Sequence, residues 1–280
     1  MALAWTDSQL RRLKELGASA GELRQSFESQ DERRSGFQNL EKSLVKSQRT
    51  QLGEFFSNHR RPALQHLEYK LSDCLIQAGF AQVSTPIIMS RGLLEKMSID
   101  SNHPLSKQIF WLPEDKCLRP MLAPHLYYLL VDLLRLCQRP VRLFEIGPCF
   151  RKESHGSQHA SEFTMLNLVE MGTAENIRAR RIRELGRLIT DAAGVSHVAF
   201  ETETSEVYGD TIDIVAAKDK LELASAAMGP HPLDHPWRIH ESWIGIGFGL
   251  ERLLMAAHQS RNLARFGRSL SYLDGIRLNI

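Results

Sequence analysis

The stretch that decides the fold runs from Val141 to Gly172 and reads VRLFEIGPCFRKESHGSQHASEFTMLNLVEMG. Two apolar runs of strand-like composition, 141–150 and 162–170, are separated by a polar segment that contains glycine. This pattern predicts a long antiparallel hairpin. The tip of the hairpin is dense in charged and ionisable residues, which are Arg151, Lys152, Glu153, His155 and His159. A turn can be built from Gly and Asn alone, so this density needs another explanation.

The returning strand of this hairpin presents a mixed row of side chains. Because alternate residues of a strand share a face, Phe163, Met165, Asn167 and Val169 point to the same side. At about 3.3 Å per residue the row spans roughly 20 Å, close to the length of a nucleotide joined to an amino acid. One face therefore offers an aromatic ring for a base at one end and an amide at the other.

Length and composition indicate an ordinary soluble globular protein. The chain has 280 residues, of which 42% are hydrophobic and 24% charged, and its formal net charge of +2 is too small to argue for nucleic-acid binding. The cysteines form no CxxC pair, so neither a zinc site nor a disulfide framework is expected. The sequence shows neither a signal-peptide pattern nor a run of about 18 apolar residues. We therefore predict a cytoplasmic location and no membrane partner.

The first sixty residues differ from the rest, because they are rich in Arg, Lys, Glu, Gln and Ser. Thr6 and Gln9 form a capping-box pattern at the start of a helix. A second helical stretch is expected over 25–54, broken near Ser35 and Gly36, so residues 1–60 are predicted to form a helical appendage. Its basic residues either face solvent or contact phosphates. They are Arg11, Arg12, Lys14, Arg33, Arg34 and Lys46.

A new pattern begins at Pro62 and predicts a helix, a strand and a terminal proline. Leucines recur at helical spacing over 64–75, and Gly79 supplies a C-terminal stop. The strand expected over 80–85 runs into Pro86, which is tolerated only at an edge or an end of a sheet.

A helix that begins at Pro124 follows a second expected hairpin over 108–122. The helix is apolar on nearly every side, which is typical of a buried helix. Leu126, Tyr127 and Leu130 share one of its faces. They either belong to the core or wall a ligand pocket, and the pattern alone leaves both readings open.

A helix of mixed charge is expected over 175–193, followed by strands over 211–216 and 221–227. Glu222 and Ser225 lie on the second strand among small and apolar neighbours. Because an unpaired buried carboxylate is costly, Glu222 needs either a salt bridge or a hard cation with oxygen ligands.

Glycine alternates with bulky residues in WIGIGFGLER, from Trp243 to Arg252. A strand here is bulky on one face and bare on the other, which usually means that something approaches the backbone closely. The run is not the dinucleotide-binding fingerprint, since Leu250 stands where that motif needs its third glycine. Arg252 lies in the first turn of the helix expected over 250–258. A cation there opposes the helix dipole, so a role outside helix stability is expected.

Three of these stretches together resemble the signature motifs of the class II aminoacyl-tRNA synthetases. The unit over 64–86 is similar to motif 1, the FRKE run at 150–153 with His159 and Phe163 to motif 2, and the glycine run at 245–252 to motif 3. Within the class, the chain beyond the appendage resembles the pyrrolysyl-tRNA synthetase family, in its short forms that lack a separate N-terminal tRNA-binding domain. The shared stretches are LRPMLAPHLYYLL, FEIGPCFRKESHG, EFTMLNL, VYGDTIDI, LELASAAMGP and SWIGIGFGLERLL.

The resemblance implies an α+β fold, in which helices flank an antiparallel sheet, with the catalytic domain over 61–280. It implies that an amino-acid carboxylate joins the α-phosphate of ATP, that pyrophosphate leaves, and that the acyl group passes to the 3′ end of a cognate tRNA. The expected amino acid is pyrrolysine or a related bulky Nε-acylated lysine. Motif 1 implies a homodimer.

The resemblance also assigns the ATP site. Arg151 matches the motif 2 arginine, which would bridge the substrate carboxylate and the α-phosphate. Glu153 would accept from the adenine amino group, and His159 would lie near the outer phosphates. Phe163 and Arg252 would hold the base between a ring and a guanidinium plane.

The metal and the amino acid are assigned in the same way. Glu222 and Ser225 would hold Mg²⁺ against the phosphates. Asn167 would hydrogen-bond the amide oxygen of the acylated lysine, and Tyr208 would close over its ring. The remaining residues of the expected amino-acid pocket are Ala123, Leu126, Tyr127, Leu130, Val169, Trp243 and Gly245.

The chain departs from the long forms of the family at His125, Val169 and Ala227, where they carry Asn, Cys and Val. These differences leave the shape of the pocket open. Two rival functions stand beside the expected one. The first is a class II relative that charges phenylalanine or transfers an amino acid to a protein, and Asn167 argues against a purely aromatic substrate. The second is a non-catalytic RNA-binding regulatory relative, which the intact motif residues disfavour.

Overall fold

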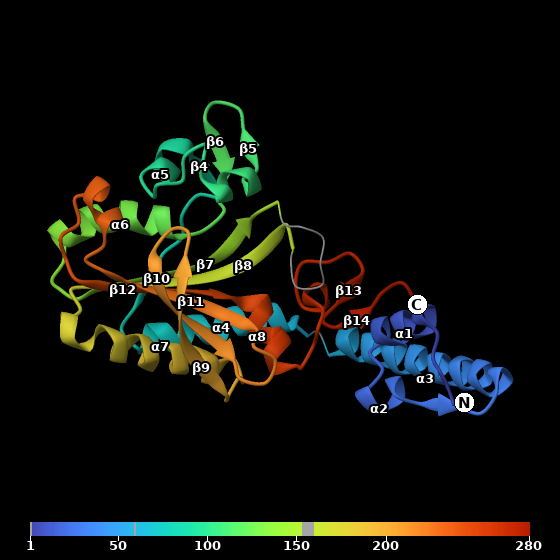
Figure 1. Cartoon of the computed structure of the whole chain (residues 1–280). Coiled ribbons are helices and arrows are strands. Elements are labelled where there is room, and N and C mark those ends of the chain that lie inside the picture. Colours follow the sequence, from blue (N-terminus) through green and yellow to red (C-terminus); the bar gives the residue numbers. More distant parts are fainter. Residues whose placement is uncertain (1, 59, 153–159) are drawn as a thin grey trace. The chain divides into compact units, whose positions relative to one another are not determined.

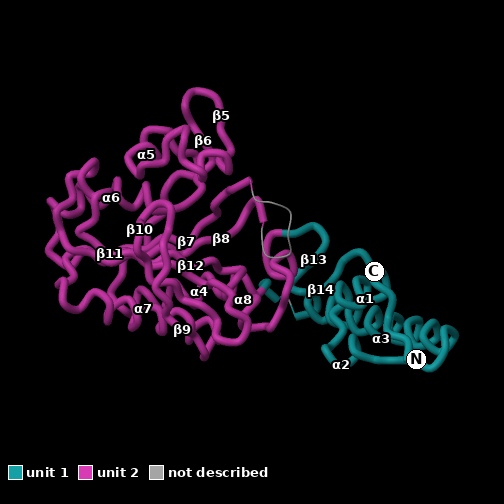
Figure 2. Tube along the Cα trace, in the orientation of Figure 1, with its two compact units in different colours: residues 1–62, 269–280 teal, residues 63–268 magenta. Residues whose placement is uncertain are grey.

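The chain forms two compact units in the computed structural model, which describes residues 2–58, 60–152 and 160–280. Unit 1 contains residues 1–62 and 269–280, and unit 2 contains residues 63–268 (Figure 2). The sequence predicts a single catalytic domain over everything beyond residue 60. The structure instead groups residues 269–280 with the N-terminal helices.

Unit 1 is mainly helical and is completed by a strand pair from the far end of the chain. Gln48 explains part of this return, because its Oε1 accepts a hydrogen bond from Arg277 N at 2.9 Å while its Nε2 donates to Leu16 O at 2.6 Å. The elements of unit 1 are β1 (Leu3–Ala4), α1 (Asp7–Glu15), α2 (Ala20–Leu23), β2 (Ser26–Phe27), α3 (Gln30–Ser57), β13 (Tyr272–Leu273) and β14 (Ile276–Arg277).

The helical signals of unit 1 are partly confirmed. Thr6 caps α1 in a capping box with Gln9, as the sequence predicts. The expected break at residues 35–36 is wrong, because α3 continues through them. A Cβ atom on Gly36 would lie 2.9 Å from Cε1 of Phe27. This glycine therefore permits close packing on a ring and does not interrupt the helix.

Unit 2 carries the main sheet. Its elements are α4 (Ala63–Gln77), β3 (Ala81–Gln82), β4 (Ile88–Ser90), α5 (Arg91–Glu95), η1 (Pro104–Gln108), β5 (Trp111–Leu112), β6 (Lys116–Leu118), α6 (Ala123–Leu136), β7 (Val141–Phe150), β8 (Glu162–Met171), η2 (Glu175–Ile177), α7 (Arg178–Ala192), β9 (Val198–Ser205), β10 (Gly209–Ala216), β11 (Glu222–Gly229), η3 (Pro232–Trp237), β12 (Trp243–Gly249), α8 (Leu250–Ala257) and η4 (Leu263–Arg265).

Among the described residues, the main sheet has seven strands in the order β3-β7-β8-β12-β11-β10-β9 (Figure 1). β3 pairs with β7 in parallel, and all other neighbours are antiparallel. The predicted central hairpin is confirmed as β7 and β8, which pair from Val141↔Met171 to Phe150↔Glu162. The second expected hairpin forms as the shorter pair β5 and β6.

Helices α4, α7 and α8 cover one face of this sheet (Figure 1). The leucines of α4 at 64, 67, 71 and 75 are buried as their spacing predicts, and the helix stops before Gly79, whose φ is +85°. From the sheet, Leu166, Ile246 and Phe248 point into this core. The α+β class with flanking helices is thereby confirmed. No helix in the described part of the chain is both long and apolar enough to cross a bilayer.

Candidate active site

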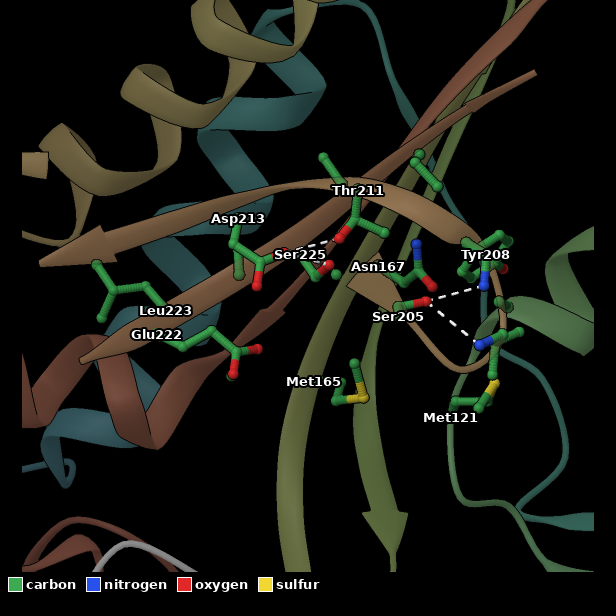
Figure 3. A pocket seen from close by; sticks show the side chains of 18 of the residues that line it. Met121, Met165, Asn167, Ser205, Tyr208, Thr211, Asp213, Glu222, Leu223 and Ser225 are labelled. Atoms are coloured by element: carbon green, nitrogen blue, oxygen red, sulfur yellow. Dashed lines mark hydrogen bonds between the residues drawn. The ribbon is translucent and has the colours of Figure 1, made fainter. Parts of the chain in front are cut away.

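The opposite face of the sheet opens into a cavity of about 530 Å³ (Figure 3). This size lies within the range of small-molecule sites. The row predicted from strand alternation lines it, since Phe163, Met165, Asn167 and Val169 all contribute. The lining also includes Ala123, Tyr127, Arg151, Ser205, Tyr208, Thr211, Asp213, Glu222, Ser225, Ala227, Trp243, Gly245, Gly247, Gly249, Glu251 and Arg252.

The floor of the cavity is set by strand register. Asn167 on β8 pairs with Gly247 on β12, which pairs with Ser225 on β11, which pairs with Asp213 on β10. The bare glycine in this row leaves open space between the polar side chains of its neighbours. A Cβ atom on Gly247 would lie 3.3 Å from Cε of Met165, and the same atom on Gly245 would lie 3.3 Å from Cζ3 of Trp243. The bare face that the glycine alternation predicts therefore lines this cavity.

A cation and an aromatic ring lie close together where β7 ends and β8 begins. Arg151 Cζ lies 5.4 Å from the centroid of the Phe163 ring, and Arg151 Nε donates to Pro120 O at 2.9 Å. Glu153 and His159, which were assigned to adenine and to the outer phosphates, lie outside the described residues.

Arg252 reaches the cavity from the first turn of α8. Its Nη1 lies 3.2 Å from Glu222 Oε2 and 3.3 Å from Glu222 O. The structure thus shows the salt bridge that was one explanation for Glu222. The side chain of Glu222 is 50% exposed, so the premise of a buried carboxylate was wrong. Ser225 donates its hydroxyl proton to Asp213 Oδ1 at 2.7 Å, and Thr211 donates to the same oxygen at 3.2 Å.

These groups fit a hard cation in composition. Glu222 and Ser225 both line the cavity and offer oxygen atoms, which Mg²⁺ prefers while it keeps several waters or phosphate oxygens. No cluster of three or more His, Cys, Asp or Glu side chains suited to a metal occurs among the described residues. A cation at this site would therefore need further ligands from a bound substrate.

The apolar end of the cavity is organised by Asp234, which no sequence pattern singled out. This residue of η3 is 3% exposed, and its carboxylate accepts from Tyr127 Oη at 3.1 Å, from Trp243 Nε1 at 2.8 Å and from His231 N at 2.7 Å. Burial and the neighbouring Tyr208 and Asp234 raise the pKa of Tyr127 well above its ordinary value. One acid thus fixes two walls of the pocket that come from α6 and β12.

Helix α6 supplies both core and pocket residues. Leu126 and Leu130 are fully buried in the apolar core and are not part of the cavity lining. Ala123 and Tyr127 do line it. The shared face predicted for Leu126, Tyr127 and Leu130 therefore divides, with only the tyrosine reaching the site.

Two further polar side chains that line the cavity are fixed by hydrogen bonds to the main chain. Asn167 is 8% exposed, and its Nδ2 donates to Leu168 O at 3.3 Å and to Ile246 O at 3.2 Å. Glu251 is 1% exposed and accepts from Thr164 N at 2.9 and 3.0 Å. Burial raises the pKa of Glu251 above its ordinary value, although the bonds from Thr164 oppose the shift. The sequence signal that could have identified Glu251 was its position beside Arg252 in the glycine motif.

This fold and this site belong to a known class of protein. A family model described as tRNA synthetases class II core domain (F) matches residues 49–274. The chain therefore belongs to the class II tRNA synthetase family.

Two solved structures give a finer likeness. A crystal structure of pyrrolysyl-tRNA synthetase from Desulfitobacterium hafniense matches with a TM-score of 0.93 and 49% identity, over 100% of both chains. A structure of Desulfitobacterium hafniense PylSc, a pyrrolysyl tRNA synthetase, matches with a TM-score of 0.89 and 49% identity, over 99% of this chain and 96% of that one. The predicted resemblance to the short forms of the pyrrolysyl-tRNA synthetase family is confirmed. The predicted enzyme class, a ligase that forms an aminoacyl-tRNA bond, is also confirmed by these matches.

Curated relatives are more distant. The lysylphosphatidylglycerol biosynthesis bifunctional protein LysX of Mycolicibacterium gilvum is 32% identical over 176 residues, which are 61% of this chain and 14% of that protein. The phenylalanine–tRNA ligase α subunit of Thermosynechococcus vestitus is 22% identical over 209 residues, which are 70% of this chain and 60% of that subunit. The chain spans less than two thirds of each of these proteins.

Proposed function

We propose that this protein activates pyrrolysine, or a related bulky Nε-acylated lysine, with ATP and transfers it to the 3′ end of a cognate tRNA. The observation that carries this proposal is the continuity of the cavity. Arg151, Phe163 and Arg252 line it together with Asn167, Tyr127 and Trp243. The proposed nucleotide end and the proposed amino-acid end therefore share one cavity, which supports binding of the adenylate of a long amino acid.

In the first step an oxygen of the amino-acid carboxylate attacks the α-phosphorus of ATP, and pyrophosphate leaves. In the second step the terminal ribose hydroxyl of the tRNA attacks the carbonyl carbon, and AMP leaves. Both steps develop negative charge, so fixed donors contribute more than a protein nucleophile. Arg151 is the proposed bridge between the carboxylate and the α-phosphate, since its planar fork suits two oxyanions at once.

The adenine ring is proposed to lie between Phe163 and the guanidinium of Arg252. The ion pair with Glu222 at 3.2 Å supports this role, because it orients Arg252 at the cavity wall. Glu153 and His159 are expected to contact the adenine amino group and the outer phosphates.

Mg²⁺ is the proposed cofactor, held by Glu222 and Ser225. When bound, it would neutralise charge on the phosphate oxygens. The hydroxyl proton of Ser225 points to Asp213 at 2.7 Å, which leaves the lone pairs of Ser225 Oγ for a cation.

The acylated side chain is proposed to occupy the space between Tyr127, Val169 and Trp243. Asn167 uses both Nδ2 hydrogens on main-chain carbonyls, at 3.3 and 3.2 Å. Donation to the amide oxygen of the substrate therefore requires the side-chain amide to exchange one of these partners for the ligand. Without that exchange, Asn167 Oδ1 would accept from the amide N–H of the substrate.

A homodimer built on motif 1 is part of the proposal. Ile87 and Ile88 follow Pro86 and are 43% and 52% exposed, which suits a surface that a second copy covers. Residence in the cytoplasm stays a prediction.

The test is amino-acid-dependent exchange of pyrophosphate into ATP, with pyrrolysine, phenylalanine and lysine compared at equal concentration. We expect exchange with pyrrolysine and little with the other two. A preference for phenylalanine or lysine would replace the proposed substrate. No exchange with any amino acid, in protein that binds tRNA, would favour the regulatory alternative.

A further inference from the structure

The tripeptide His-Pro-Leu occurs twice in unit 2, at 103–105 and at 231–233. Each copy begins a 3₁₀ helix, η1 in the first case and η3 in the second, and each histidine is the N-cap residue. The two copies are far apart in sequence, yet both meet the same short turn. This turn, 206–208, joins β9 to β10 and lines the proposed amino-acid pocket.

Both histidines bond in the same way. His231 Nδ1 accepts from Leu233 N at 3.1 Å, and its Nε2 lies 2.9 Å from Tyr208 O. His103 Nδ1 accepts from Leu105 N at 3.1 Å, and its Nε2 lies 3.3 Å from Glu206 O.

These contacts fix the tautomer of each ring. A main-chain N–H can only donate, so the Nδ1 that faces it carries no proton. The proton is then on Nε2, which faces a main-chain carbonyl that can only accept. Each imidazole therefore accepts from its own helix and donates to the turn.

The turn is also bonded from inside. Ser205 Oγ accepts from Tyr208 N at 2.8 Å and from Val207 N at 3.3 Å (Figure 3). The Tyr208 ring meets the rings of His231 and Trp243 at centroid distances of 5.9 and 6.3 Å. Movement of this turn would thus move Tyr208 against a wall of the pocket.

Capping alone does not account for histidine at both positions. Asn, Asp, Ser and Thr are the preferred N-cap residues, and each supplies the acceptor that a cap needs. The imidazole differs from them in offering a second, opposite nitrogen at a longer reach. In both copies that second nitrogen meets the turn.

We infer that His103 and His231 form a pair of positioning residues that hold the 206–208 turn, and with it Tyr208, over the amino-acid pocket. The identity of the ligand rests on the proposed function. The support of the turn by these two histidines, called the clamp below, does not depend on it. The consequence for activity is selective. Loosening the turn weakens binding of the acylated side chain and leaves the ATP end of the cavity unchanged.

Two substitutions at His231 separate the clamp from the cap. His231→Asn keeps a capping acceptor and removes the donor to Tyr208 O. His231→Gln keeps a donor of suitable reach and removes the short capping acceptor. We expect His231→Asn to raise the KM for pyrrolysine about 3- to 10-fold, the effect of one neutral hydrogen bond, with the KM for ATP unchanged. We expect His231→Gln to stay within about twofold of the unsubstituted enzyme for both substrates.

His103→Asn, with its longer bond, is expected to show the same selectivity at smaller size. The matched control is His66→Asn, an exposed histidine of α4 for which no change is expected. A wild-type KM for pyrrolysine in His231→Asn would overturn the inference. So would equal losses in His231→Asn and His231→Gln, because keeping the donor to Tyr208 O would then give no advantage.

Amide hydrogen exchange of the full chain without substrates tests the clamp apart from the activity. We expect faster exchange at Val207 and Tyr208 in His231→Asn than in His66→Asn. Unchanged exchange there would overturn the clamp. If exchange rises as expected while the unsubstituted protein does not activate pyrrolysine, the clamp stands and the proposed substrate fails.

Discussion

Arg151 is the residue on which the proposed activation step most depends. Its guanidinium is oriented at the cavity wall by the bond from Nε to Pro120 O, at 2.9 Å. We predict that Arg151→Ala lowers pyrophosphate exchange by at least about 100-fold, as removal of a fixed donor to a developing charge does. The melting temperature should change little, since the side chain lies at the edge of a cavity. The control is Arg135→Ala, whose 79% exposed side chain pairs with Asp132 within α6. An active Arg151→Ala enzyme would refute the assigned role.

Asp234 determines the shape of the amino-acid end. Replacement by Ala leaves the buried Tyr127 hydroxyl and the Trp243 indole N–H without their acceptor, at a cost of about 1–3 kcal/mol for each buried group. We predict a lower melting temperature and a KM that rises for pyrrolysine but not for ATP. Tyr127→Phe, which removes one of these bonds, should give a smaller change in the same direction. Equal increases in both KM values would show that Asp234 supports the fold alone. Asp132→Ala, on the exposed side of α6, is the control.

At the scale of elements, Glu170 ties β8 to its neighbours. Its Oε2 accepts from Arg142 on β7 at 2.7 Å and from Arg181 on α7 at 3.0 Å. Burial opposes ionisation, but the hydrogen bonds from Arg181, Arg142 and Thr173 outweigh it and hold the pKa of Glu170 below its ordinary value of 4.5.

This pKa shift predicts a pH dependence of stability. A carboxyl with a depressed pKa in the folded state stabilises the protein above its unfolded pKa, and that contribution is lost as the pH falls through the folded value. We therefore expect Glu170→Gln to lower the melting temperature at pH 7 and the difference to shrink as the pH falls below 4.5. Glu184→Gln, half exposed on α7, should show a much smaller effect at pH 7. A difference that persists at low pH would mean that Glu170 acts through packing.

The elements that sequence predicts well are those with a strict period. Alternation along β8 and β12 placed Phe163, Asn167 and the glycines on one face, because strand period admits a single assignment once one face is buried. The break predicted at Gly36 of α3 was wrong, because glycine is used both to interrupt a helix and to allow close packing. The acid that supports the amino-acid end of the cavity could not be predicted. Asp234 bonds across 107 residues to Tyr127, and no local pattern encodes a contact of that separation.

At the scale of the whole molecule, unit 1 is the candidate for tRNA contact. The side chains of Arg11, Lys14, Arg34 and Lys46 are exposed, whereas Arg12 pairs with Glu41 at 2.8 Å and Arg33 donates to Ala4 O at 3.2 Å. We predict that alanine at the four exposed positions raises the KM for tRNA and leaves pyrophosphate exchange unchanged. The slope of log K for tRNA binding against log salt concentration should become shallower by about 0.7–0.9 for each phosphate that is no longer neutralised. Unaltered tRNA binding would assign tRNA recognition to other surfaces.

Unit 1 is assembled from segments that precede and follow unit 2 in the chain. During translation the ribosome therefore delivers β13 and β14 only after the whole catalytic sheet has been made. Until then α1 and α3 lack the partners that Arg277 and its neighbours provide. Unit 1 therefore gains its last two strands only after every residue of unit 2 has been added, although most of its own residues are made first.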